Sequence, residues 1–265
     1  MNEPSPADFV VAIPARYGSI RLPGKPLRRI AGEPMIVHVA RRAREAGARE
    51  VVVATDDARI ADHAAGFGAE VVMTSSDARN GTERCAEVAA KLPGYDAIVN
   101  LQGDAPLTPA WFVEDLLRGL AADPAAEIAT PVLRCDGRAV SGFLADRRAG
   151  RVGGTTAVFG AGGRGLYFSK EVIPYTGRDY APDEPTPVFH HVGVYAYRPA
   201  ALAAYPSWPV GPLETLEGLE QLRFLENGRA VLCVEVEARG RAFWELNNPS
   251  DVAVIESMLR GGLPV

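Results

Sequence analysis

The chain has 265 residues, and its 33 acidic and 28 basic side chains give a formal net charge of −5. This length allows a substantial core, and the acidic balance argues against nucleic acid as a partner. No run approaches the ~20 apolar residues that span a bilayer, and residues 1–7 lack the features of a secretory signal. We therefore expect a cytoplasmic protein without a membrane partner.

Three cysteines stand far apart in the chain, at Cys85, Cys135 and Cys233. They match neither a metal-ligand spacing nor a disulfide framework. We expect them to be buried as small apolar residues.

The most informative stretch is a run of apolar residues at 10–13 that breaks into a basic loop. The run predicts a strand buried on both faces, and open α/β sheets bind ligands at the carboxyl ends of such strands. The loop contains Arg16, Arg21 and Lys25, and prolines stiffen it by fixing φ. Its spacing is neither G-x-x-x-x-G-K-[ST] nor G-x-G-x-x-G, which disfavours ordinary kinases and dinucleotide enzymes. A solvated basic loop is the plain alternative, but the stiffening favours a polyphosphate ligand.

The next segments alternate between helix and strand. A helix should begin at Pro34, a strand should cover residues 48–54, and Asp57 should cap a helix that ends near residue 65. Strands at 70–73 and 96–101 then flank a helix that Thr82 could cap and that ends at residue 91. This rhythm predicts a parallel sheet with right-handed crossovers.

The strand at 96–101 ends in Gln102-Gly103-Asp104. A lone aspartate in a turn is usually structural. At the end of a strand opposite a phosphate loop, however, a carboxylate is well placed to hold Mg²⁺, which takes one or two carboxylates together with phosphate oxygens. We therefore expect Asp104 to bind the metal.

The second half is harder to interpret. It should contain a helix at 109–120, a strand at 128–133, a Gly- and Arg-rich excursion at 134–165 and a strand at 189–197. In that last strand His191 and Tyr195 would share one face. A leucine-rich helix at 213–225, a strand at 230–236 and a helix ending near residue 260 complete the chain.

The loop at 15–27, A-R-x-x-S-x-R-L-P-G-K-P-L, resembles the signature of cytidylyltransferases that activate acidic sugars, most closely the 3-deoxy-manno-octulosonate (Kdo) cytidylyltransferases. Further matches are G-T-E-R at 81–84, Q-G-D at 102–104, H-x-G-x-Y-x-Y at 191–197 and L-E-Q-L-R at 219–223. The resemblance spans about residues 8 to 258. It implies a single α/β domain over 1–265, a three-layer nucleotidyltransferase (Rossmann-like) fold with a mostly parallel mixed sheet. It also implies an acceptor-side and dimerisation subregion at about 134–228, and a homodimer.

The resemblance also implies roles for individual residues. The catalytic residues would be Arg16, Lys25 and Asp104. CTP would be bound by Pro14, Ala15, Arg16, Arg21, Lys25, Gly81, Thr82, Arg84 and Gln102. The acceptor would be bound by His191, Tyr195, Glu220 and Gln221. Mg²⁺ would be held by Asp104 and Asn247, where Asn247 replaces a family aspartate but still offers a carbonyl oxygen.

Ala105 replaces a glutamate of the family pattern directly after Asp104, but the metal ligand itself is kept. Three further departures concern the acceptor: Thr156 stands at the position of a lysine, an asparagine is lost near Gly153, and His190 replaces an arginine. They favour a small acidic acceptor, such as the phosphonate phosphonoformate, whose charge Arg151 or Arg164 could meet. The expected reaction is CTP plus acceptor giving CMP-acceptor and pyrophosphate. The alternatives are an authentic Kdo cytidylyltransferase and a non-catalytic CTP-binding protein.

Overall fold

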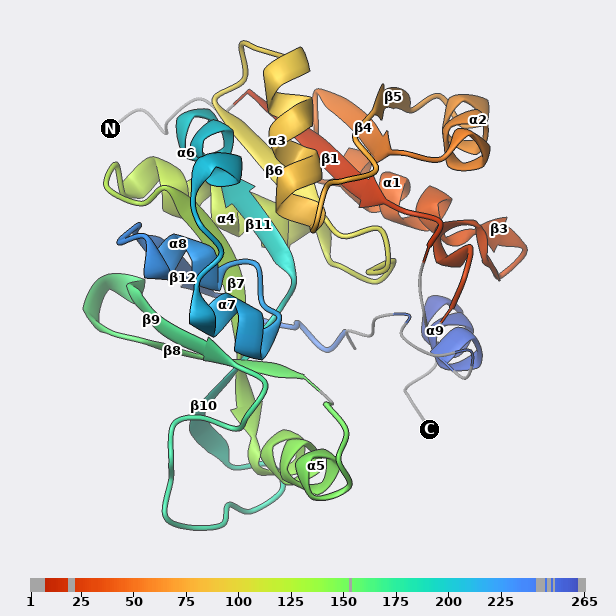
Figure 1. Cartoon of the computed structure of the whole chain (residues 1–265). Coiled ribbons are helices and arrows are strands. Elements are labelled where there is room, and N and C mark those ends of the chain that lie inside the picture. The colour runs from red at the N-terminus through yellow and green to blue at the C-terminus, as the bar shows by residue number, and fades with distance from the viewer. Residues whose placement is uncertain are drawn as a thin grey trace, which may run out of the picture.

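The computed structural model describes residues 8–18, 22–152, 154–241, 246, 249 and 251–261. One large mixed sheet runs through the molecule, with its strands in the order β5-β4-β1-β6-β11-β7-β10-β8-β9 and β12 paired to β7 (Figure 1). No helix among these residues is long and apolar enough to cross a membrane.

The N-terminal half of the sheet is parallel throughout. Its strands are β1 (Phe9–Ala15), β4 (Glu50–Thr55), β5 (Glu70–Met73) and β6 (Ala97–Leu101), and its helices are α1 (Met35–Glu45), α2 (Ala58–Gly66), α3 (Gly81–Lys91) and α4 (Ala110–Ala122). Alternate β1 residues belong to different cores: Val11 and Ile13 pack with α1, α2 and α4, whereas Val10 and Ala12 pack with α3. This arrangement gives the three layers, because a strand buried on both faces needs a helix on each.

The rest of the sheet is mostly antiparallel. Its elements are β7 (Ile128–Asp136), α5 (Gly137–Arg148), β8 (Thr155–Phe159), β9 (Gly165–Ser169), β10 (Pro185–His191), β11 (Val194–Tyr197), α6 (Pro199–Ala204), α7 (Pro212–Glu217), α8 (Leu222–Glu226), β12 (Val231–Glu235) and α9 (Asp251–Leu259). The small elements are β2 (Arg29–Ile30), β3 (Glu33–Pro34) and the 3₁₀ turns η1 (Lys25–Leu27), η2 (Ala161–Gly163) and η3 (Tyr205–Ser207).

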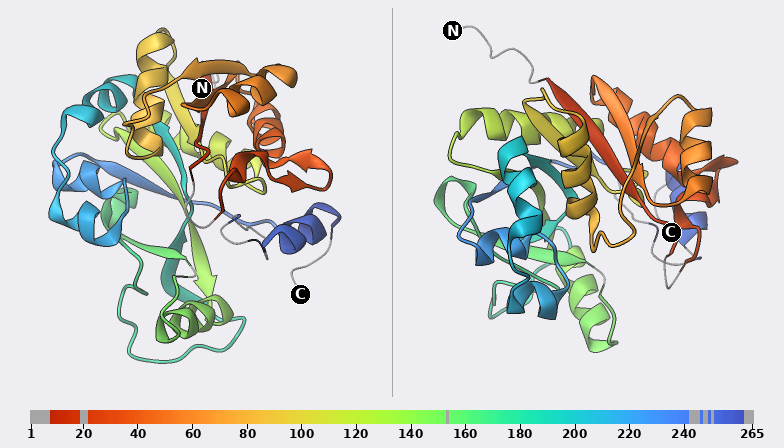
Figure 2. Two further views of the ribbon diagram at one scale, coloured as in Figure 1. Left: turned by 45° about the vertical axis from the view of Figure 1, so that its right-hand side comes forward. Right: turned by 45° about the horizontal axis from the view of Figure 1, so that its top comes forward.

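The strand β7 extends beyond the edge where the parallel strands end. Ala196 of β11 pairs with both Val99 of β6 and Ala129 of β7, so the last residues of β7 project past the end of β6. There they pair with β10, which in turn pairs with β8. We call this projecting part, with α5 and β8–β10, the acceptor-side lobe. It lies on the opposite side of the molecule from β5 and α2 (Figures 1 and 2).

Three sequence predictions of local structure are wrong. The cap of α3 is Asn80, whose side chain accepts a hydrogen bond from Glu83 N at 2.9 Å, and Thr82 lies inside the helix. The predicted strand at 189–197 is two strands, because the six residues from His191 to Ala196 oppose only four on β7 and the ladder breaks between them. The predicted helix at 213–225 is divided between α7 and α8 at Gly218, whose φ of 61° ends α7 in a left-handed cap.

Candidate active site

The basic loop after β1 is folded back onto the turn after β6. The loop closes where Gly24 N donates to Tyr17 O at 3.0 Å. Gly24 has a φ of 69°, and a Cβ there would lie 3.2 Å from the Tyr17 ring, so glycine suits this position. The closed loop places Lys25 Nζ 2.7 Å from Asp104 Oδ2, although 79 residues separate the two. The structure thus brings together the two residues that carried the polyphosphate and metal predictions.

Three loop segments converge beside this pair. A Cβ on Gly81 would lie 2.8 Å from Gln102 Nε2 and 3.2 Å from Pro14 Cγ. A Cβ on Gly103 would lie 2.8 Å from Pro14 O. Because a real Cβ does not approach a backbone oxygen so closely, glycine at 103 lets the turn after β6 meet the end of β1, while Gly81 brings the start of α3 against Gln102 and Pro14. The predicted CTP residues of these segments therefore form one group.

Glu220 belongs to this group as well. Its carboxylate accepts from Thr82 N at 3.0 Å and from Gln102 Nε2 at 3.2 Å. Burial raises the pKa of the Glu220 carboxyl above its ordinary value. The residue predicted for the acceptor thus touches two residues predicted for the nucleotide, so the two predicted subsites adjoin one another.

The other predicted acceptor residues lie just behind Glu220. Tyr195 Oη donates to Gln221 Oε1 at 3.1 Å, and Gln221 is 1% exposed. Within the described part of the chain, Gln221 Nε2 is a buried donor without a hydrogen-bond partner. Ala15 is buried at the end of β1, on the nucleotide side.

His191 is a packed core residue. Its ring centroid lies 5.7 Å from that of Tyr195 and 5.0 Å from that of Phe168, and its Nε2 is 2.9 Å from Thr130 Oγ1. Burial lowers the pKa of His191 to about 3, so the imidazole is neutral at neutral pH. The ring supports Tyr195, and its contact with an acceptor stays a prediction.

The arginines predicted to bind CTP differ in their burial and in their partners. Arg84 is 4% exposed and donates to Thr74 Oγ1 at 2.5 Å and to Asp56 Oδ2 at 3.1 Å, so it joins the ends of β4 and β5. Arg16 is exposed directly after β1. Arg21 and Asn247 lie outside the described residues. A CTP contact through Arg84 stays a prediction.

A buried ion-pair cluster around Arg223 was not predicted. Arg223 donates from Nε and Nη2 to the two oxygens of Glu214 at 2.6 and 2.7 Å, and from Nη1 to Glu83 at 2.9 Å. Burial by itself would raise the pKa of Glu83, but hydrogen bonds from Arg79 and Arg223 hold it below its ordinary value. Glu83 and Arg223 both belong to motifs that carried the family resemblance. The sequence therefore pointed to these residues but not to their ion pairs. The cluster fastens the start of α3 to α7 and α8.

The donor set suits a magnesium ion bound together with phosphates. Asp104 offers a half-buried carboxylate, a hard oxygen donor of the kind Mg²⁺ takes. Asp104 O also accepts from Leu246 N at 3.0 Å, which brings the residue preceding Asn247 in the sequence to the same turn. No group of three or more His, Cys, Asp or Glu side chains forms a metal site among the described residues. Phosphate oxygens would therefore complete the coordination.

Two residues that depart from the family pattern, Thr156 and His190, are used within the acceptor-side lobe, whereas Gly153 lies outside the described residues. Thr156 is fully buried, and its Oγ1 donates to Glu171 O at 2.6 Å and accepts from Ile173 N at 3.2 Å. Burial lowers the pKa of His190 to about 4, and its ring packs on Phe143. These polar groups hold the lobe together.

The two arginines suggested for the acceptor charge have other partners. Arg151 pairs with Asp146 at 2.8 Å on the surface. Arg164 pairs at 2.6 Å with Asp123, the C-cap of the 13-residue helix α4. The turn with Asp104 precedes the other end of α4, about 20 Å away at 1.5 Å per residue. Arg164 is therefore paired far from Asp104, and its contact with an acceptor stays a prediction.

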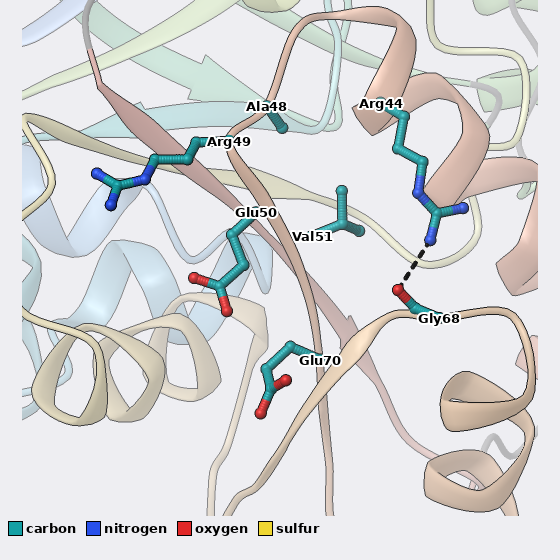
Figure 3. A pocket seen from close by; sticks show the side chains of 7 residues that line it. All are labelled: Arg44, Ala48, Arg49, Glu50, Val51, Gly68 and Glu70. Carbon is teal, nitrogen blue, oxygen red and sulfur yellow. Dashed lines mark hydrogen bonds between the residues drawn. The ribbon is translucent and has the colours of Figure 1, made fainter.

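A surface depression of about 360 Å³ lies elsewhere, where β4 and β5 begin (Figure 3). It is lined by Arg44, Ala48, Arg49, Glu50, Val51, Gly68 and Glu70. Arg44 points across to the carbonyl of Gly68, to which it donates at 3.2 Å. Since the candidate site lies where the strands end, this depression is separate from it.

A three-layer sheet with a basic loop paired to a carboxylate at its carboxyl edge defines the class: the chain is an α/β nucleotidyltransferase. The sequence model of the family described as Cytidylyltransferase matches residues 10–232. The chain belongs to the cytidylyltransferase family, as the loop at 15–27 predicted.

Similar proteins agree with this assignment. A 3-deoxy-manno-octulosonate cytidylyltransferase of Maricaulis maris is 43% identical over 94% of this chain and 96% of its own length. One from Hahella chejuensis is 46% identical over 83% of this chain and 86% of its own length. A solved CMP:2-keto-3-deoxy-manno-octonic acid synthetase complexed with CTP aligns with a TM-score of 0.82 at 37% identity, covering 97% of this chain and all of that one. A Leptospira borgpetersenii cytidylyltransferase shares the fold, with a TM-score of 0.60 at 19% identity over 97% of this chain and 88% of that one.

Proposed function

We propose that the protein transfers CMP from CTP to Kdo in a Mg²⁺-dependent reaction that releases pyrophosphate. The observation that carries this proposal is the 2.7 Å pair of Lys25 and Asp104 beside the converging Pro14, Gly81 and Gln102 segments. The relatives named for Kdo, at 43 and 46% identity, support the sugar acid better than the phosphonate that the sequence favoured.

The chemistry is mainly positioning and charge neutralisation. A hydroxyl oxygen of the acceptor forms a bond to the α-phosphorus of CTP and releases its proton to solvent, the bond to the bridging oxygen breaks, and pyrophosphate leaves. Arg16 and Lys25 would hold the phosphates and neutralise the charge that develops on them. A magnesium ion on Asp104 and Asn247 would add a Lewis acid for phosphate oxygens.

The acceptor would lie on the Glu220 side of this group. Glu220 accepts hydrogen bonds, Tyr195 and Gln221 lie next to it, and Thr82 and Gln102 connect it to the nucleotide side. A hydroxylated acid offers donors to such groups. Loss of the family lysine at Thr156 is compatible with this acceptor, because Thr156 is buried in the lobe.

Pyrophosphate release with CTP and Mg²⁺, measured on Kdo and phosphonoformate side by side, tests the acceptor. We expect efficient use of Kdo with phosphonoformate inert, and the reverse result would establish the phosphonate. A panel of the four nucleoside triphosphates tests the base, since equal use of ATP would refute cytidylyl specificity.

A non-catalytic CTP-binding protein is the second candidate, because asparagine stands at position 247 where the family has a metal-binding aspartate. Binding of CTP without turnover across a broad panel of acids would favour it. Pyrophosphate release with any acceptor would exclude it.

We also propose a homodimer formed through β9 and α7. The strand β9 ends the order of the main sheet, so one of its edges is unpaired. Beside it, Glu217 of α7 accepts from Ser169 Oγ and Lys170 N, while Leu166 and Leu216 are 63 and 81% exposed. Sedimentation of the wild type against the Leu166→Asp and Leu216→Asp variants tests this, and a monomeric wild type would refute it.

A further inference from the structure

The ammonium group of Lys25 forms an ion pair with Asp104, the carboxylate that we assign to the metal. Lys25 Nζ lies 2.7 Å from Asp104 Oδ2, and the two side chains are 13% and 33% exposed. Backbone contacts position both residues of the ion pair. Lys25 begins η1 directly after Gly24, and Asp104 O accepts a hydrogen bond from Leu246 N. Lysine and metal therefore compete for the same carboxylate, because a cation on either oxygen of Asp104 would lie close enough to the ammonium to be repelled by it.

The competition has an energetic consequence. A divalent cation binds the Asp104 carboxylate tightly only if the repelling ammonium moves away, and Mg²⁺ already gives up its water reluctantly. A displaced ammonium in a mostly buried position needs another anion. Within the part of the chain that the structure describes, Asp104 is the carboxylate that pairs with Lys25. The triphosphate is the anion that can replace it.

We propose that Lys25 is a positioning residue that holds Asp104 in place until the nucleotide arrives and then transfers its ammonium to the phosphates as the cation takes the carboxylate. The inference rests on the proposed function of this site, and it concerns binding alone. Metal and nucleotide binding are then positively coupled through the exchange, each raising the affinity for the other by the same factor.

The exchange predicts opposite effects of one substitution on two affinities. In a Lys25→Met variant, Asp104 is free, so a divalent cation without nucleotide binds more tightly. The same variant has lost a positive charge for the phosphates, so CTP without metal binds more weakly. A merely structural lysine, whose removal disorders the loop, would weaken both.

The experiment measures the two affinities separately in the full chain. Mn²⁺ binding without nucleotide is followed by the electron paramagnetic resonance signal of the free ion, and CTP binding in EDTA is followed by calorimetry. We expect Lys25→Met to bind Mn²⁺ about tenfold more tightly, inside the range of about 5- to 150-fold common for coupled ligands. CTP binding in EDTA should weaken by a similar factor.

Two further variants serve as controls. Arg16→Met removes a positive charge from the same loop without touching the pair, so its Mn²⁺ affinity should change little. Asp104→Asn should abolish the tight Mn²⁺ site in both backgrounds. If Lys25→Met does not fold by circular dichroism, Lys25→Gln replaces it.

Unchanged or weaker Mn²⁺ binding in the lysine variant would overturn the proposal, as would equal tightening in Arg16→Met. Neither result depends on turnover. Failure of the proposed function would instead appear as absence of pyrophosphate release with every acceptor.

Discussion

The parallel half of the sheet and the acceptor-side lobe use their polar residues in different ways. In the parallel half, Lys25 and Asp104 come from loops that follow buried strands and meet at the edge of the sheet. In the lobe, Thr156 and His191 are buried, and each makes its hydrogen bond inside the protein. Lys25 and Asp104 are therefore partly exposed at an edge where such sheets bind ligands, whereas the polar groups of Thr156 and His191 are already satisfied inside the protein.

The difference follows from how each region obtains its core. Parallel strands covered by helices on both faces complete their core without the loops at their ends. The lobe consists of antiparallel strands at the far end of the main sheet. Phe168 and Phe189 join it to a large core, whereas its part near α5 packs on a small apolar cluster with Cys135, Val140 and Val188 at its centre. Polar side chains must therefore help to hold it together.

The largest effect should come from the junction between α3 and the segment of α7 and α8. Arg223→Leu leaves Glu214 buried without its partner and leaves Glu83 with Arg79 alone, and we expect a loss of about 3–5 kcal/mol in the free energy of unfolding. Urea denaturation measures it. Arg229→Leu is the matched control, because its pair with Glu127 is exposed and should be worth about 0–1 kcal/mol. Equal losses of stability in both variants would show that the buried ion pairs do not hold α3 to α7 and α8.

Next come the loop residues of the parallel half. Asp104→Ala and Lys25→Ala should each lower kcat by about 10²- to 10³-fold, because each removes one group that stabilises the transition state. The free energy of unfolding should change by less than about 1 kcal/mol, since the pair is partly exposed. Pyrophosphate release and urea denaturation check the two quantities. Near-normal Mg²⁺-dependent turnover in Asp104→Ala would refute the metal assignment.

The lobe should respond in the opposite way. Thr156→Val leaves Glu171 O and Ile173 N without the hydroxyl, at a cost of about 1–3 kcal/mol in stability. The KM for the acceptor should not change. Thr155→Val, one residue away and less buried, is the control. A raised acceptor KM at unchanged stability would instead place Thr156 in the acceptor site.

The buried His191 should make stability depend on pH. Its pKa is about 3 in the folded protein against an ordinary 6.5, so between these values the unfolded chain binds the extra proton. Stability is therefore full above pH 6.5 and falls on acidification, by at most about 1.4 kcal/mol per pH unit for this residue. Urea denaturation of wild type and His191→Gln from pH 7 to 5 should show a smaller acid loss in the variant. Parallel curves would mean that His191 is protonated in the folded state.

The smallest effect should come from the arginines once suggested for the acceptor. Arg164→Gln and Arg151→Gln remove surface ion pairs, so stability should change by about 0.5 kcal/mol or less. The KM values for CTP and acceptor should stay the same. A rise in the acceptor KM alone would show that one of these arginines meets the charge of the acceptor.

Much of the fold could be predicted because burial leaves a pattern in the sequence. The strand at 70–73 and the Asp57 cap are found as predicted. The helix α5 left no such pattern, since only Gly137 and Val140 of its residues are buried. The helix end at Gly218 was missed because leucines continue at every third position on both sides of it. Such a pattern shows which side of a helix is apolar, but it does not show where the backbone turns.

The contacts of the candidate site also divide into those that the sequence could predict and those that it could not. Lys25 and Asp104 could be paired from sequence, because adjacent parallel strands end at one edge. The contact of Glu220 with Thr82 and Gln102 could not, since it spans 138 and 118 residues and depends on the turn at Gly218. The Arg223 cluster was missed for the same reason.

These long separations bear on how the protein is made. A nascent chain has formed its four parallel strands once residue 101 has emerged, yet β11, the partner of β6, begins at residue 194. Until then β6 presents an open edge, a surface to which other chains can add during synthesis. Glu220, which holds Thr82 and Gln102, emerges later still. The contacts of Glu220 with Thr82 and Gln102 can therefore form only in a nearly finished chain, after the ribosome has delivered most of the sequence.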